Sequence, residues 1–262
     1  MPDLKRIHET ANAIIVMFEH ELLPRIIVQA DNEAAKMSAC LTLSIFEQFH
    51  AAMKLSGAGL ASHAAGPIRS MLDGLGDLLN LSASPAYVDS MKLYTARENG
   101  KLFDELLASD NIDDEMRGTL NDWIGLNRPI VAELTAREIK TSGLKDKLTN
   151  VGVGGMYVSY RVLCAFVHSN VTTLLQRHDN GSSPVLEYRA PIRPEVIVML
   201  HNLAMDYLIR CVNEISKFST GVPADEVGAM TDKAVAMWRE VVPAPEGYGV
   251  EQTPECPITD AY

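Results

Sequence analysis

Four side chains that can do chemistry lie close together in the stretch YVSYRVLCAFVHSN, residues 157–170. Arg161 is a permanent cation, and His168 can take up or release a proton near neutral pH. Tyr160 and Cys164 add a hydroxyl and a thiol. At about 100° of rotation per residue, all four fall within one arc of about 100° on a helix. The spacing therefore predicts a single polar stripe, which is suited either to acting on a substrate or to holding helices together.

The helix that must carry this stripe, over about 155–177, is otherwise apolar on nearly every side. A helix that is apolar all round is typical of the centre of a helical protein. A charged Arg161 in such a place needs an opposite charge, because an unpaired buried charge is very costly. We expect that partner to be Asp73 or Asp77, which lie four residues apart on an earlier helix that also carries Arg69.

The composition favours helices throughout the chain. Of the 262 residues, 47% are hydrophobic but only 6% are aromatic, and unbranched side chains lose little freedom in a helix. The fold is therefore predicted as all-α, a bundle of seven to nine helices with one short extended segment near 184–190. We expect one helical domain over 1–241, followed by a Pro-rich C-terminal arm or disordered tail over 242–262.

Charge and hydropathy limit the partners of the chain. The net charge is −11, which repels nucleic acid at long range, so no DNA partner is expected and any RNA contact needs a local basic pocket. No apolar run approaches the length of about 18 residues that a membrane span needs. The opening MPDLKRIHET is charged and does not resemble a signal peptide, and the four cysteines form no Cys-x-x-Cys pair. We expect a cytoplasmic protein with reduced thiols and no membrane contact.

The sequence gives no support for a metal or cofactor site. Glu47 and His50 have the Glu-x-x-His spacing of helical di-iron sites, but those sites need the motif on two helices and the chain has only one. No cluster of His and Cys has the spacing of zinc ligands. The segment NVGVGG follows no strand and lacks the Lys-Ser/Thr of a phosphate loop. We therefore predict no metal and no cofactor.

Two segments together resemble an uncharacterised bacterial family of all-helical proteins. These are GPIRSMLDGLGDLLNL and, about ninety residues later, YRVLCAFVHSN. The family's pattern is an Arg-x-x-x-Glu helix followed by a Tyr-x-x-x-Ser-x-x-x-His helix. The matching positions here are Arg69, Asp73, Tyr160, Cys164 and His168, so Asp73 replaces the glutamate and Cys164 the serine. The resemblance covers about 35–180 and implies a helical fold without implying a reaction.

The Arg-x6-His spacing of Arg161 and His168 is also similar to the motif of HEPN-type helical ribonucleases. Those enzymes usually have a polar residue after the arginine, where this chain has Val162. The resemblance implies a homodimer in which the Arg161 and His168 pairs of two subunits meet in a cleft and cleave RNA without metal, in a toxin or phage-defence setting. The histidine would act on the 2′-hydroxyl, and the arginine would stabilise the phosphorane. The supporting set would comprise Arg69, Asp73, Tyr160, Cys164 and Asn170.

Two other roles fit the same residues. In a non-catalytic helical binding or scaffold protein, His168, Arg161 and an aspartate would form a structural network that keeps the helices in register. In a protein that binds a small anion, Arg69, Asp73, Tyr160 and His168 would line the pocket. The sequence leaves these alternatives open.

Overall fold

The computed structural model describes residues 3–109, 111–168, 171–179, 186, 188 and 192–243. Within these residues the chain forms ten α-helices and two short 3₁₀ turns, η1 (Leu23–Arg25) and η2 (Ala61–Ala64), without a strand. The helices are α1 (Leu4–Glu21), α2 (Glu33–Gly57), α3 (Ala65–Ala83), α4 (Tyr87–Leu107), α5 (Asp114–Ala136), α6 (Leu144–Asn150), α7 (Met156–Val167), α8 (Val171–His178), α9 (Pro194–Phe218) and α10 (Ala224–Val241).

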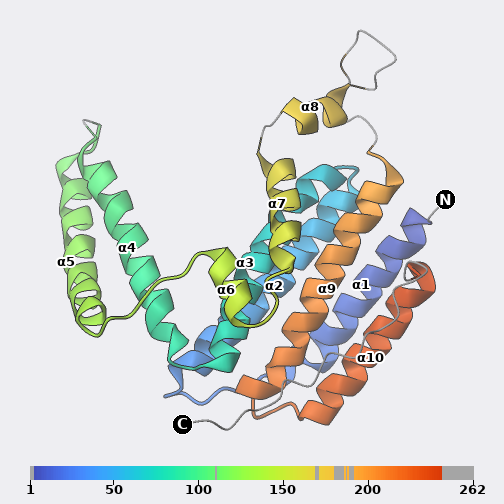
Figure 1. Cartoon of the computed structure of the whole chain (residues 1–262), viewed down its shortest axis with the longest axis horizontal. Coiled ribbons are helices and arrows are strands. Elements are labelled where there is room, and N and C mark those ends of the chain that lie inside the picture. Colours follow the sequence, from blue (N-terminus) through green and yellow to red (C-terminus); the bar gives the residue numbers. More distant parts are fainter. Residues whose placement is uncertain are drawn as a thin grey trace.

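The centre of the bundle is formed by α2, α3 and α9, which pack on one another (Figure 1). α1 and α10 pack together beside α9, and α6 and α7 pack on α3. Buried apolar side chains recur at helical spacing on the inner faces, as in Ile68, Leu72 and Leu75 of α3 and Leu200, Ala204 and Leu208 of α9. One large apolar core therefore joins most of the helices.

The prediction of an all-helical fold is confirmed, but the helix count of seven to nine is slightly low. One of the additional helices is the short α6, which spans Leu144–Asn150. The helix expected over about 155–177 is two helices, α7 and α8, because α7 ends at Val167.

Two further predictions fall mainly on residues that the structure does not describe. The extended segment expected near 184–190 lies outside the described residues except for Leu186 and Tyr188. The C-terminal arm expected over 242–262 does so except for Val242 and Pro243.

α4 and α5 form an antiparallel hairpin that stands to one side of the bundle (Figure 1). α4 packs on α2 and α3 at its base, whereas α5 makes its extensive contacts with α4 alone. The hairpin has its own small core of Phe103, Leu120 and Ile124. The Phe103 and Trp123 rings lie 5.3 Å apart between centroids.

None of the helices in the described part of the chain combines the length and the apolar character that a membrane span requires.

Candidate functional site

α7 carries the predicted polar stripe, and its position is set by α3 and α6. α6 can approach α3 closely at Gly76, where an added Cβ would lie 3.2 Å from Cδ1 of Leu144. Gly74 faces Ile45 of α2 in the same way, with a Cβ distance of 3.4 Å. At both glycines, the atoms nearest to an added Cβ belong to side chains of the adjacent helix and not to its backbone. The chain then turns through Gly154 and Gly155 into α7, which packs on α3 and α6.

α7 is not the central helix that its apolar sequence predicts. Leu163 is its only side chain classed as fully buried. Val158 is 68% exposed and Val162 is 37% exposed, and Ala165 is exposed beside them. α7 lies on the outside of α3 and leaves one apolar side uncovered by any described part of the chain. The term outer face of α7 is used below for Val158, Arg161, Val162, Ala165 and His168.

The polar stripe divides between the two sides of α7. Tyr160 and Cys164 are partly buried and lie toward α3, whereas Arg161 and His168 are exposed. The expectation that Arg161 is buried and paired with Asp73 or Asp77 is therefore wrong. Among the described residues, neither the Arg161 nor the His168 side chain makes a hydrogen bond or an ion pair.

Arg69 is the centre of the inward half of the stripe. Its Nη2 donates a hydrogen bond to the Tyr160 hydroxyl at 3.0 Å, and its Cζ lies 5.0 Å from the centroid of the Tyr160 ring. The Nε of Arg69 lies 4.0 Å from a carboxylate oxygen of Asp73, one turn away on α3. The Tyr160 ring stacks on Tyr157 with 5.6 Å between centroids. Arg69, Asp73, Tyr160 and Cys164 are called the Arg69 cluster below.

The electrostatics of this cluster reflect its partial burial. Burial acts to lower the pKa of Arg69, but the Cys164 sulfur, the Tyr160 oxygen and the Asp73 carboxylate together raise it. Burial raises the pKa of Tyr160, and its hydrogen bond with Cys164 adds to this effect. Burial also raises the pKa of Asp73, against the attraction of Arg69. The cluster therefore keeps Arg69 charged and Tyr160 protonated, which suits a structural clamp between α3 and α7.

Asp77 has partners of its own, on α4 and α6. Its carboxylate forms a mostly buried ion pair with Lys147 at 2.6 Å and accepts a hydrogen bond from the Tyr87 hydroxyl at 2.7 Å. Burial and the Asp77 charge raise the pKa of Tyr87. Lys147 also lies over the Tyr94 ring, 5.5 Å from its centroid. Asp77 therefore ties α3 to α4 and α6 and takes no part in holding α7.

The C-terminal end of α7 is built by side chains of α8. The last carbonyl groups of a helix lack partners within it. Thr173 donates a hydrogen bond to the Ala165 carbonyl at 2.6 Å, and Arg177 donates one to the Phe166 carbonyl. His168 is the residue at which the backbone leaves the helix. Asn170, predicted as a supporting residue, lies outside the described residues.

Sequence reasoning missed a second group of basic side chains near the end of α7. Arg177 lies close enough to η2 to donate a hydrogen bond to the Ser62 carbonyl at 3.4 Å, and burial lowers its pKa. Burial also lowers the pKa of His63, and the charges of Arg177 and His178 add to this effect. These three residues line a small cavity of about 70 Å³. His63 lies more than 100 residues before Arg177 and His178, so no sequence spacing indicated that these side chains would meet.

No metal cluster is present in the described part of the chain, where no group of three or more His, Cys, Asp or Glu side chains converges. His50, which has Glu-x-x-His spacing with Glu47, instead contacts Glu19 of α1 at 2.6 Å.

Comparison with known proteins gives no relative. No protein-family model, curated protein or solved structure matches this chain.

Proposed function

We propose that the protein is a HEPN-like, metal-independent endoribonuclease that acts as a homodimer, with Arg161 and His168 as catalytic residues. The observation that carries the proposal is that both side chains are exposed and have no partner among the described residues, although they lie on an otherwise apolar helix face. The inward Arg69 cluster already accounts for the structural role that such polar residues would serve. Arg161 and His168 therefore remain available for a substrate.

The apolar outer face of α7 supports the homodimer. Val158 and Val162 lie side by side next to Arg161 on α7, and an exposed apolar helix face of this kind marks a contact surface. A second copy packed on this face would cover the valines. It would also bring two Arg161–His168 pairs to the same interface, as the HEPN resemblance implies.

The reaction follows from the chemistry of the two side chains. The imidazole of His168 takes the proton of the RNA 2′-hydroxyl, whose oxygen then attacks the adjacent phosphorus. The guanidinium of Arg161 stabilises the extra negative charge of the phosphorane. The P–O5′ bond breaks and the 5′-oxygen takes up a proton, which leaves a 2′,3′-cyclic phosphate and a 5′-hydroxyl. Arg177 near the end of α7 supplies a local positive charge in a chain of net charge −11.

The test is cleavage of a labelled single-stranded RNA in the presence of EDTA, with the product ends identified by mass spectrometry. The wild-type protein should leave 2′,3′-cyclic phosphate ends. Arg161→Ala and His168→Ala should each lower the rate by at least about 100-fold, the usual contribution of a general base. Both variants should keep the wild-type melting temperature, because their exposed side chains make no hydrogen bond or ion pair among the described residues.

Arg6→Ala and His20→Ala are matched controls, because both residues are exposed on α1, far along the chain from the site. Both controls should cleave RNA at the wild-type rate. Equal cleavage by wild-type protein and His168→Ala would identify a contaminating ribonuclease and contradict the proposal.

The alternative of a non-catalytic helical binding or scaffold protein is favoured by one observation. Ion pairs and hydrogen bonds of Arg69 and Asp77 link α3 to α4, α6 and α7, as a structural network does. If the protein does not cleave RNA, this network and the α4–α5 hairpin favour a non-catalytic binding module. The small-anion pocket is less supported, because His168 is not brought to Arg69, Asp73 and Tyr160.

A further inference from the structure

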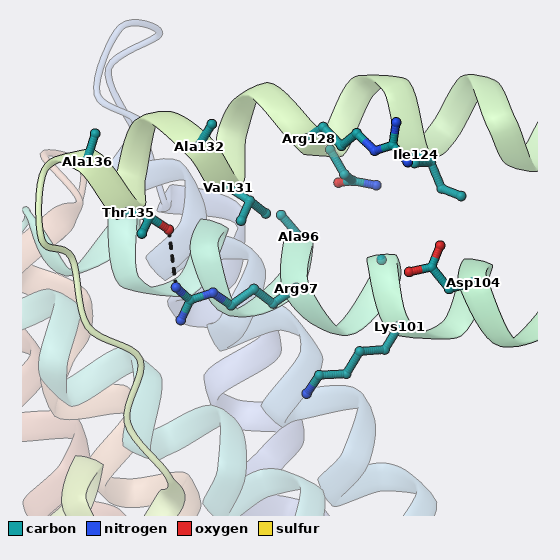
Figure 2. Close-up of a pocket in the computed structure, with 12 residues that line it drawn as sticks. Ala96, Arg97, Lys101, Asp104, Ile124, Arg128, Val131, Ala132, Thr135 and Ala136 are labelled. Atoms are coloured by element: carbon teal, nitrogen blue, oxygen red, sulfur yellow. Dashed lines mark hydrogen bonds between the residues drawn. The ribbon is translucent and has the colours of Figure 1, made fainter.

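A groove runs between α4 and α5 on one side of the hairpin (Figure 2). Its cavity volume is about 800 Å³. Pockets for small molecules in proteins commonly have volumes of about 300–1,000 Å³. The groove is called the hairpin groove below; it is lined by Ala96, Arg97, Gly100, Lys101, Asp104, Ile124, Asn127, Arg128, Val131, Ala132, Thr135 and Ala136.

The floor of the hairpin groove is apolar and built from small residues. Ala96 of α4 lies opposite Val131 of α5 (Figure 2), and Gly100 also lines this floor, where larger side chains would close the space between the helices. A Cβ added at Gly100 would meet no atom within 4 Å. Small residues at these positions therefore leave the groove empty, above a floor that includes the buried side chains of Ala96 and Ile124.

The rim of the hairpin groove is positively charged. Arg97 reaches from α4 to Thr135 of α5, where its Nη2 donates a hydrogen bond at 3.2 Å (Figure 2). Arg128 has no hydrogen bond or ion pair among the described residues. Lys101 points away from α5 and pairs with Glu98 at 2.6 Å. Asp104 is the only acid among the lining residues, which is unusual for a chain of net charge −11.

No other described helix covers the hairpin groove, because α5 makes its extensive contacts with α4 alone. An occupant must therefore come from outside the described part of the chain. The apolar floor requires a hydrocarbon or aromatic body, whose burial contributes about 25 cal/mol for each Å² of apolar surface. Arg128, whose guanidinium has no partner among the described residues, favours an anionic group, since a guanidinium matches the geometry of a carboxylate or phosphate.

We propose that the hairpin groove binds an amphipathic small molecule that carries one carboxylate or phosphate group on an elongated apolar body. The body lies on the floor between Gly100 and Val131. The anionic group is held by Arg128, whose guanidinium lies at the other end of the groove from the Arg97–Thr135 hydrogen bond (Figure 2). This site is separate from Arg161 and His168, so ligand binding in the hairpin groove is tested independently of RNA cleavage.

The test compares dodecanoate, dodecyl phosphate and uncharged dodecanol by isothermal titration calorimetry with the full chain, each below its critical aggregation concentration. Dodecanoate or dodecyl phosphate should bind with one site per chain, at least 10-fold more tightly than dodecanol. Arg128→Ala should reduce this preference for the anion to less than threefold. Gly100→Leu should abolish binding of all three, because its side chain enters the empty volume.

Gly118→Leu is the matched control. Gly118 lies on α5 of the same hairpin and has open space around it, but it does not line the groove. This control should bind as the wild type does, and a thermal melt should show that every variant is folded. Equal affinity for dodecanol and dodecanoate would overturn the proposal, as would unchanged binding by Gly100→Leu.

Two further results would show that the hairpin groove binds an occupant other than a small molecule. If the wild type self-associates with concentration and Gly100→Leu does not, a second copy of the chain fills the groove. If the protein binds vesicles of anionic phospholipid but none of the monomeric amphiphiles, the groove contacts a lipid surface. Either result overturns the proposal.

Discussion

Arg161 and His168 differ from Tyr160 and Cys164 in their surroundings, although all four share one stripe of the sequence. Tyr160 lies against Arg69, whose Nε lies close to Asp73, so the inward half of the stripe packs on α3. The spacing could not show where the buried side of α7 ends, because the valines on the outer face are as apolar as core residues. Within the stripe, Tyr160 and Cys164 are partly buried and have a structural role. Arg161 and His168 are exposed to solvent, and they are the proposed catalytic residues.

Tyr160→Phe should destabilise the protein by about 1 kcal/mol, because it removes the hydrogen bond from Arg69 and keeps the ring beneath the guanidinium. Urea denaturation followed by circular dichroism measures this loss. Tyr94→Phe is the control, because the ring of Tyr94 contacts Lys147 while no hydrogen bond of its hydroxyl stabilises the fold. Equal stability of the two variants would show that the Arg69–Tyr160 hydrogen bond contributes nothing.

Cys211 of α9 should resist alkylation in the folded protein at about pH 8.5, whereas the exposed Cys40 reacts. Burial raises the pKa of the Cys211 thiol from 9.0 to about 12. Because the folded-state pKa is the higher one, the thiol's contribution to stability is complete below pH 9 and is lost as the pH rises toward 12. Peptide mass spectrometry after iodoacetamide treatment measures the labelling. Rapid labelling of Cys211 without denaturant would contradict the buried position.

α7 and α8 show how a helix boundary is set by side chains of the following helix. Periodicity continued through 155–177 and so predicted one helix. The break occurs because Thr173 and Arg177 fold back and satisfy the carbonyl groups of Ala165 and Phe166. Such side-chain capping depends on where α8 lies in space. The spacing of apolar residues along the chain does not reveal that position.

Thr173→Val should destabilise the α7–α8 junction by about 1 kcal/mol, because it keeps the side-chain shape and removes the hydroxyl that caps Ala165. Hydrogen exchange of peptides that cover the last turn of α7 should become faster. Thr172→Val is the control, since Thr172 is exposed on the same helix. Unchanged exchange in Thr173→Val would mean that other contacts hold the end of α7.

The whole molecule is a helical bundle with a hairpin attached at one side. Composition predicted the helical class, because Ala, Leu and Met are frequent and aromatic residues are few. It did not predict that α5 would stand away from the core. Trp123 and Leu126 have the residue types of core positions, yet they are 46% and 70% exposed. Packing between helices that are distant in sequence decides which apolar faces are covered. A single sequence carries no direct signal of that packing.

The α4–α5 hairpin should open independently of the bundle. Its core is small and α5 has extensive contacts with one helix only, so its local stability should be several kcal/mol below that of α3 and α9. Native-state hydrogen exchange in low urea should show α5 amides exchanging first and α9 amides last. Exchange of both helices at the same rate would show that hairpin and bundle unfold as one unit.

The central claim is that the outward pair Arg161 and His168 acts on RNA while the inward Arg69 cluster holds α7 in place. The most direct measurement is the rate of RNA cleavage in EDTA by His168→Ala, expressed per folded molecule and paired with its melting temperature. We predict a loss of at least about 100-fold with an unchanged melting temperature. Cleavage at the wild-type rate, or a lowered melting temperature that accounts for the loss, would contradict the claim.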